Sequence, residues 1–283
     1  MQAANRLQTA LRTGSGVSFG AWQMLPGANH ARIMARSGFD WVCVDTEHGN
    51  IAGEDLKLPR SLGEGSMGNR KADYILLDAQ MHEAVAAIAA TGVSPIVRIA
   101  ANEGWMVKRA LDSGAHGIVV PLLYTADDAR RLVKSAKFPP VGNRGFGSPF
   151  AMGSTGGVSQ TDYLLQANDA LVTIVQIETR EALENVEEIA QVQGVDVLLI
   201  GPWDLGNNIG RPVVGAAFHD DLIAAIERIR KAATDNGKKV GVYSTSGEAA
   251  KKYADQGFHM ISVTADIVAL PTFLKNAVET ARS

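Results

Sequence analysis

The sequence has little cysteine, no long apolar run and no excess of positive charge. Cys43 is the only cysteine among 283 residues, which excludes an intramolecular disulfide. It lies in the apolar run 41–44, where we expect a buried and unreactive thiol. No apolar run approaches 18 residues, so we expect no membrane-spanning helix. The net charge of −3 gives no electrostatic reason to expect nucleic acid as a partner.

Acidic residues are also absent from the N-terminal part of the chain. The first one is Asp40, whereas Arg6, Arg12, Arg32 and Arg36 precede it. Mitochondrial transit peptides share this bias. Residues 5–12 fit a short amphipathic helix that opens the fold equally well. We therefore expect a cytoplasmic protein, with the transit peptide as the alternative.

What the sequence does contain is a regular alternation of apolar, β-branched runs with helical patterns. A hydrophobic content of 46% is enough for a large core. Eight alternations predict a single (β/α)8 TIM barrel over residues 1–283. A doubly wound open sheet is the alternative, but no Gly-x-Gly-x-x-Gly motif follows the first run. The expected strands are 18–22, 41–45, 95–98, 117–121, 171–177, 195–200, 239–242 and 259–264.

Polar side chains stand where four of these strands end. The ends of parallel strands meet at one rim of a barrel, and this rim carries the active sites of barrel enzymes. The sequence therefore predicts a reaction centre rather than a purely structural barrel. The residues concerned are Asp45, Glu47, His48, Arg98, Glu178 and Asp204.

Glu178 and Asp204 are the pair around which we interpret the site. They lie 26 positions apart (204 minus 178), about the length of one strand–helix unit, so their strands should be neighbours. Two carboxylates placed close together repel each other unless one takes a proton or a divalent cation lies between them. We favour the cation. The alternative is that Glu178 caps the following helix and Asp204 shapes a turn.

Three further residues have both a functional and a structural interpretation. His48, just past a strand end, has the side chain best suited to a general base, or it is a loop histidine bonded to the backbone. Arg98 starts from a buried strand and either binds a carboxylate or enolate oxygen or pairs permanently with Glu47 or another acid. Asp112 lies near a helix end, where its charge opposes the helix dipole and suggests a specific partner.

Two stretches interrupt the repeat. Residues 51–80 exceed the length of one unit by about 30 residues and show neither helical nor strand periodicity, so we expect a surface insertion there. Residues 138–150 form a long Gly- and Pro-rich loop that could act as a lid over the strand ends.

Six motifs, taken together and in order, resemble the metal-dependent class II 2-keto-acid aldolases, in the superfamily that includes the citrate lyase β subunit. The type member of these aldolases is 2,4-dihydroxyhept-2-ene-1,7-dioate aldolase. The resemblance covers nearly the whole chain except 51–80. Two residues depart from it, because Thr46 stands where many relatives have Gly and Trp203 where many have Ala. The motifs lie at 45–49, 95–98, 109–117, 139–145, 175–180 and 200–204.

The resemblance implies a fold, an assembly and a set of roles. The fold is a barrel of the phosphoenolpyruvate/pyruvate type, assembled as a hexamer that is a trimer of dimers. Glu178 and Asp204 would ligate Mg²⁺, Mn²⁺ or Co²⁺, with no organic cofactor. His48 would be the base, Arg98 would stabilise the enolate, and Asp112 of an adjacent subunit would raise the basicity of His48. Gln176 and Trp203 would bind the 2-keto-acid substrate together with Arg98, and Asp45 and Glu47 would support the site.

The resulting hypothesis is a metal-dependent aldolase that cleaves 4-hydroxy-2-oxo acids into pyruvate and an aldehyde through a metal-stabilised pyruvate enolate. No lysine lies at the strand ends that carry these groups, which argues against a Schiff-base aldolase. Three alternatives remain. They are an oxaloacetate decarboxylase on the same site, an acyl-CoA lyase, and a non-catalytic oligomeric barrel whose site is disrupted by the insertion at 51–80.

Overall fold

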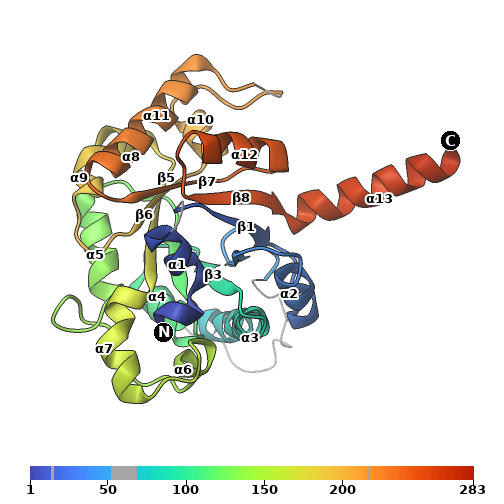
Figure 1. The fold of residues 1–283 in the computed structure, drawn as a ribbon. Coiled ribbons are helices and arrows are strands. Elements are labelled where there is room, and N and C mark those ends of the chain that lie inside the picture. Colours follow the sequence, from blue (N-terminus) through green and yellow to red (C-terminus); the bar gives the residue numbers. More distant parts are fainter. Residues whose placement is uncertain (14–15, 52–68, 216) are drawn as a thin grey trace.

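Eight parallel strands close into a barrel in the order of the sequence, and β8 pairs with β1 (Figure 1). The computed structural model describes residues 1–13, 16–51, 69–215 and 217–283, with residues 69–78 described by their backbone alone. The barrel confirms the predicted (β/α)8 fold. Its strands are β1 (Ser18–Gln23), β2 (Trp41–Asp45), β3 (Ser94–Arg98), β4 (Gly117–Val120), β5 (Val172–Ile177), β6 (Val197–Ile200), β7 (Lys239–Val242) and β8 (Met260–Ala265).

The strands form because their residues are β-branched or large and apolar and are buried on both faces, as a parallel sheet under a layer of helices requires. Alternate side chains fill the barrel interior, where Trp41, Cys43 and Ile96 belong to one apolar cluster. The residues between them, such as Val42 and Val97, face the helices and belong to a second cluster. Burial raises the pKa of the Cys43 thiol, in agreement with the expected inert state.

Helices connect the strands on the outside of the barrel. Thr125 and Asp128 begin one of them with a capping box, in which each side chain accepts from the other residue's backbone N–H. The connecting helices are α2 (Ala28–Ala35), α3 (Asn69–Ala89), α4 (Gly104–Asp112), α5 (Ala126–Ala136), α6 (Phe150–Ser154), α7 (Gln160–Ala170), α8 (Arg180–Glu184), α9 (Val186–Ala190), α10 (Pro202–Asn208), α11 (Asp220–Asp235) and α12 (Gly247–Asp255).

The single helix expected over 181–190 is two short helices, α8 and α9. Asn185 separates them with a backbone at φ −97° and ψ 11°, outside the helical region. Its side-chain amide donates to the carbonyl oxygen of Tyr124 at 3.1 Å, which fixes this junction against the segment after β4.

A short N-terminal helix covers the end of the barrel at which the strands begin. It is α1 (Arg6–Arg12), preceded by the 3₁₀ helix η1 (Gln2–Ala4). Leu7 and Leu11 belong to the apolar cluster of the barrel interior. Asn5 caps α1 and donates to two backbone carbonyls, those of His116 and Ala170. The amphipathic helix predicted at 5–12 is therefore present.

The prediction of a non-helical insertion over 51–80 is wrong for its C-terminal part. Helix α3 begins at Asn69, whereas we expected no helix before Met81. Residues 71–77 contain good helix formers, Ala and Leu among them, but no apolar stripe, and periodicity alone does not detect such a helix. Residues 52–68 of the predicted insertion lie outside the described residues.

The loop 138–150 lies at the N-terminal ends of the strands, so the expectation that it covers the strand ends of its own chain is wrong. It follows α5 and leads through α6 and α7 into β5. The backbone N–H groups of Asn143 and Arg144 donate to carbonyls of Lys134 and Lys137 at the end of α5. Ser148 donates to the carbonyl oxygen of Asp112, just before β4. Length and composition indicated a loop but carried no information about the rim on which it lies.

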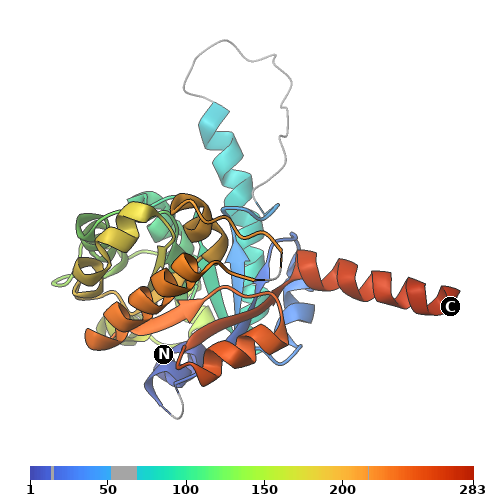
Figure 2. The ribbon, with the colours of Figure 1, turned by 90° about the horizontal axis from the view of Figure 1, so that it is seen from above.

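The last helix, α13 (Asp266–Arg282), projects away from the barrel in both views (Figures 1 and 2). Several of its large apolar side chains are exposed, among them Leu270 and Phe273. Within the described ranges, no helix combines the length and the apolar character needed to cross a membrane.

Candidate active site

A small cavity of about 160 Å³ opens at the C-terminal ends of the strands. It receives side chains from β1, β2, β3 and β5, from the residues that follow β1, β2 and β7, and from the start of α10. Four of the residues predicted for catalysis or binding therefore meet there together with Asp45 and Asp204. The lining residues are Trp22, Met24, Asp45, His48, Arg98, Gln176, Gly201, Trp203, Asp204 and Tyr243.

Arg98 and Asp45 form a buried ion pair at the floor of this cavity. They are direct neighbours across β2 and β3. Nε and Nη2 of Arg98 donate to the two carboxylate oxygens of Asp45 at 2.9 and 2.5 Å, and Nη1 lies 3.0 Å from Glu47 Oε2. The guanidinium also lies over the ring of Trp22, with 4.5 Å between its central carbon and the ring centroid. The permanent pairing considered for Arg98 is thus present, while the side chain still lines the cavity.

Asp45 also shapes the loop that carries His48. Its Oδ1 accepts from the backbone N–H groups of Glu47 and His48 at 3.1 and 3.3 Å. Thr46 donates through its hydroxyl to the carbonyl oxygen of Arg98 at 2.6 Å, which ties the loop to β3. A Cβ at Gly49 would lie 2.3 Å from the carbonyl oxygen of Asp45, so this turn requires glycine. The imidazole of His48 is half-exposed, 3.8 Å from Glu47 Oε1.

Glu178 lies directly behind the cavity wall rather than in its lining. Its Oε1 accepts from the backbone N–H of Leu122 at 2.8 Å, and its Oε2 accepts from the side-chain amide of Gln176. Leu122 has φ 49°, a left-handed conformation that costs a non-glycine residue about 1–2 kcal/mol. Burial, together with the charges of Asp204 and Glu47, raises the pKa of Glu178 to about 7, against the lowering effect of the Leu122 N–H.

Asp204 stands in the first turn of α10, and its charge acts on both glutamates. Burial first, and then the charges of Asp45 and Asp204, raise the pKa of Glu47 to about 7, although Arg98 lowers it. Three carboxylates therefore share one negative region. The backbone of Gly201 approaches Glu178 so closely that a Cβ there would lie 2.5 Å from Oε2.

These residues fit a divalent cation. Carboxylate oxygens are the ligands that Mg²⁺ and Mn²⁺ prefer, and each Glu178 oxygen keeps one free lone-pair direction. The side-chain oxygen of Gln176 is buried beside them without a hydrogen-bond partner. Among the described residues there is no group of three or more His, Cys, Asp or Glu side chains arranged around one point. A cation at Glu178 and Asp204 would thus take its remaining ligands from substrate and water.

The raised pKa of Glu178 predicts how stability depends on pH in the absence of metal. Between about pH 4.5 and pH 7 the folded protein keeps a proton that the unfolded chain has released. Because the folded state binds more protons in this window, the group's contribution to the free energy of unfolding falls as pH rises. Relative to Glu178→Gln, wild type should lose about 2–3 kcal/mol between pH 4.5 and pH 8. Urea denaturation at several pH values measures this difference, and a constant difference would contradict the assignment.

Asp112 lies at the other end of the barrel, so the structure does not bring it near His48 of the same chain. It is the last residue of α4, just before β4 begins. Its carboxylate accepts from Nη2 of Arg144 at 3.1 Å, and the same nitrogen donates to the Tyr163 hydroxyl. The specific partner suggested by its place in the sequence is therefore Arg144 within this chain.

Sequence reasoning predicted Trp203 but missed the two other aromatic residues of the site, Trp22 and Tyr243, and one backbone donor. Trp22 and Tyr243 line the cavity from β1 and from just after β7, with 5.5 Å between their ring centroids. Trp22 ends a predicted strand and Tyr243 follows one, and this position could have identified them. Aromatic side chains at such positions, however, usually belong to the hydrophobic core. The sequence could not indicate the Leu122 N–H as a donor to Glu178, because every residue except proline has a backbone N–H.

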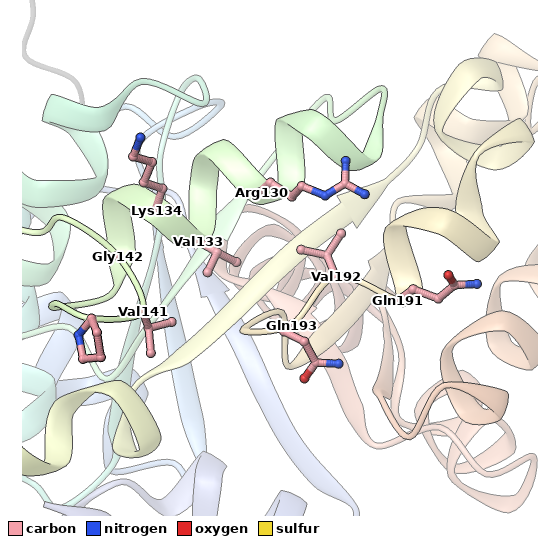
Figure 3. A pocket seen from close by; sticks show the side chains of 9 residues that line it. Arg130, Val133, Lys134, Val141, Gly142, Gln191, Val192 and Gln193 are labelled. Carbon is pink, nitrogen blue, oxygen red and sulfur yellow. The ribbon is translucent and has the colours of Figure 1, made fainter.

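A wider hollow of about 630 Å³ lies between α5 and the loop after α9 (Figure 3). Its lining includes Arg130 and Lys134 but no carboxylate or histidine, and it faces the N-terminal ends of the strands. It therefore offers neither the ligands nor the base that the cavity at the opposite rim combines.

A comparison with protein families places this geometry in a known group. The family model described as HpcH/HpaI aldolase/citrate lyase matches residues 67–270. The chain belongs to this family. The family predicted from the six motifs is thereby confirmed, and with it the expectation of an aldolase-type enzyme.

Members of the family that resemble the chain extend over most of its length. The 2-dehydro-3,6-dideoxy-6-sulfogluconate aldolase of Pseudomonas putida is 36% identical over 248 residues, which are 88% of this chain and 86% of that protein. The 4-hydroxy-2-oxo-heptane-1,7-dioate aldolase of Escherichia coli (strain ATCC 8739) is 33% identical over 94% of this chain and 90% of that protein. A crystal structure of a family protein from Burkholderia cenocepacia J2315 has a TM-score of 0.82 at 32% identity, covering 99% of this chain and 100% of that one.

Proposed function

We propose that the protein is a divalent-metal-dependent aldolase that cleaves 4-hydroxy-2-oxo acids into pyruvate and an aldehyde. The observation that carries the proposal is the convergence of His48, Arg98 and Asp204 on one cavity, with Glu178 behind its wall and electrostatically coupled to Asp204. The names of the two curated relatives support the substrate class, because both describe aldolases of 2-oxo acids.

The chain's own residues divide the work of binding between them. Glu178 and Asp204 would hold a divalent cation, which when bound would supply Lewis-acid polarisation of the substrate's 2-oxo group. Gln176 and the backbone of Gly201 form the end of the cavity nearest to these acids. The 2-oxo-carboxylate end of the substrate binds at this end. Arg98 is held rigidly by Asp45, so its remaining N–H groups are oriented in advance toward charge that develops on the substrate.

His48 is the base of the cleavage step. It accepts the proton of the C4 hydroxyl, the C3–C4 bond breaks, and the bonding electrons pass to the pyruvate half as its enolate. The aldehyde leaves with a C4 carbonyl group. The proton that His48 accepted is returned to C3, which completes pyruvate and regenerates the base. Glu47 lies beside both groups, with 3.8 Å between its Oε1 and Nε2 of His48 and 3.0 Å between its Oε2 and Nη1 of Arg98.

Pyruvate release from 4-hydroxy-2-oxo acids, coupled to lactate dehydrogenase, tests this proposal. We expect turnover with Mg²⁺, Mn²⁺ or Co²⁺, loss of at least about 99% of it after EDTA treatment, and recovery when metal is returned. Turnover that EDTA leaves unchanged would eliminate the metal-dependent mechanism. Oxaloacetate, tested in parallel, shows whether the same site favours decarboxylation.

We further propose that the protein acts as a homo-oligomer, a trimer of dimers, in which Asp112 serves a neighbouring subunit's His48. Helix α13 supports this, because it projects from the barrel with exposed apolar side chains such as Leu270, Phe273 and Leu274. The position of Asp112, at the rim opposite to its own His48, leaves such a role only to a neighbour. A monomer in sedimentation analysis would contradict this arrangement.

A further inference from the structure

The cavity has two chemically different sides. Gln176, Gly201 and Asp204 form the polar side, next to Glu178. The other side is an aromatic wall, which we define as Trp22, Tyr243 and Trp203. Tyr243 stands in the middle of this wall, with 5.5 Å between its ring centroid and that of each tryptophan and with edge-to-face geometry at both contacts.

The aromatic wall is held in place by contacts with Phe218 and Arg98. Trp203 packs edge-to-face on Phe218, with 6.1 Å between the centroids, and the ring of Trp22 is fixed beneath the guanidinium of Arg98. Edge-to-face pairs and cation–π contacts stabilise such an arrangement beyond simple burial. The wall therefore limits the cavity, whose volume of 160 Å³ is well below the roughly 300–1,000 Å³ of pockets that take drug-sized ligands.

The charge of the cavity is as restrictive as its size. The carboxylates of Asp45 and Asp204 line the cavity, and those of Glu47 and Glu178 lie next to it. Arg98 is the one lysine or arginine in the lining formed by the described residues, and it already contacts Asp45 and Glu47. Even with a divalent cation bound, pyruvate's own carboxylate brings a further negative charge. Among the described residues of this chain, a second anionic group on the substrate would find no free cation to pair with, which is unfavourable.

We propose that the aldehyde half of the substrate is short and uncharged and that it packs against the aromatic wall, with Trp203 setting the length limit. This inference rests on the proposed aldolase function. It separates the protein from the two curated relatives, whose names specify substrates with a second acidic group, a carboxylate in one and a sulfonate in the other.

Three substrates separate the effects of length and charge. 4-Hydroxy-2-oxopentanoate releases acetaldehyde, 4-hydroxy-2-oxoheptanoate releases butanal, and 4-hydroxy-2-oxoheptane-1,7-dioate releases an aldehyde of the same length as butanal that carries a carboxylate. We expect kcat/KM to be highest for the pentanoate and at least about 100-fold lower for the dioate than for the heptanoate, since an unpaired buried charge is rejected more strongly than a methylene. A dioate cleaved as well as the heptanoate would overturn the proposal.

Two variants test the aromatic wall itself. Trp203→Ala should raise the heptanoate-to-pentanoate ratio of kcat/KM about tenfold while leaving the dioate-to-heptanoate ratio unchanged, because it adds room but no positive charge. Tyr243→Leu should also raise the heptanoate-to-pentanoate ratio of kcat/KM. It replaces Trp203→Ala in the test if that variant does not fold. Trp105→Ala is the matched control, since Trp105 is 44% exposed against 40% for Trp203 but lies on α4 outside the cavity. An unchanged length ratio in both wall variants would overturn the role of the wall.

The same assay distinguishes failure of this inference from failure of the proposed function. If all three substrates release pyruvate at similar rates, the aldolase function stands and the short, uncharged aldehyde is wrong. If none releases pyruvate with metal present, the proposed function fails and the inference fails with it.

Discussion

Replacing Glu178 by Gln lowers aldolase kcat/KM by about a thousandfold and abolishes measurable Mn²⁺ binding. Glutamine keeps the size of the side chain and its hydrogen bond from Leu122, but it removes the negative charge that holds the cation. Loss of Lewis-acid assistance is worth several kcal/mol, and each 1.36 kcal/mol is a factor of ten in rate. Steady-state kinetics with saturating Mn²⁺ and isothermal titration calorimetry measure the two effects.

The matched control for this variant is Glu181→Gln. Glu181 stands three positions further along, exposed in the first turn of α8, and should leave both Mn²⁺ affinity and kcat/KM within about twofold of wild type. The metal-free Glu178→Gln protein should also be more stable than wild type at pH 8, so a loss of activity cannot be ascribed to unfolding. Full Mn²⁺ affinity in Glu178→Gln would refute the assignment of this carboxylate as a ligand.

The second large effect concerns the buried ion pair. Arg98→Met should lower the free energy of unfolding by about 3–5 kcal/mol, because it leaves the fully buried carboxylate of Asp45 without its partner. It should also remove activity, since the guanidinium lines the cavity. Urea denaturation monitored by circular dichroism gives the stability change.

A double variant and a surface variant make this result interpretable. Asp45→Asn combined with Arg98→Met should recover part of the lost stability, because no uncompensated charge remains. Arg130→Met removes an exposed partner of Asp127 and should cost at most about 1 kcal/mol. If Arg98→Met lowered the free energy of unfolding no more than Arg130→Met does, the buried pair of Arg98 and Asp45 would not be a major contributor to stability.

The barrel could be predicted from the sequence because its strands are short, apolar on both faces and bounded by polar residues. The predicted runs 41–45 and 171–177 match β2 and β5 almost to the residue. The same boundaries also predicted the position of Glu178, Asp204 and His48 at one rim, since the ends of parallel strands in a barrel necessarily meet. Topology, rather than any single motif, made this part of the site predictable.

What could not be predicted depends on contacts that residue type does not reveal. The backbone N–H of Leu122 acts on Glu178 through a left-handed conformation, and the lining role of Tyr243 depends on rings that come from three separate elements. The start of α3 at Asn69 was missed because a helix without an apolar stripe leaves no periodic signal. The loop 138–150 was placed on the wrong rim because composition says nothing about direction.

The most direct test of the account is a crystal structure of the protein with Mn²⁺ and pyruvate, in which anomalous scattering locates the ion. We predict one Mn²⁺ with a carboxylate oxygen of Glu178 and one of Asp204 each at about 2.0–2.4 Å, and pyruvate beside Gln176 and Gly201. An ion bound elsewhere, or bound by one of these two carboxylates alone, would contradict the central claim.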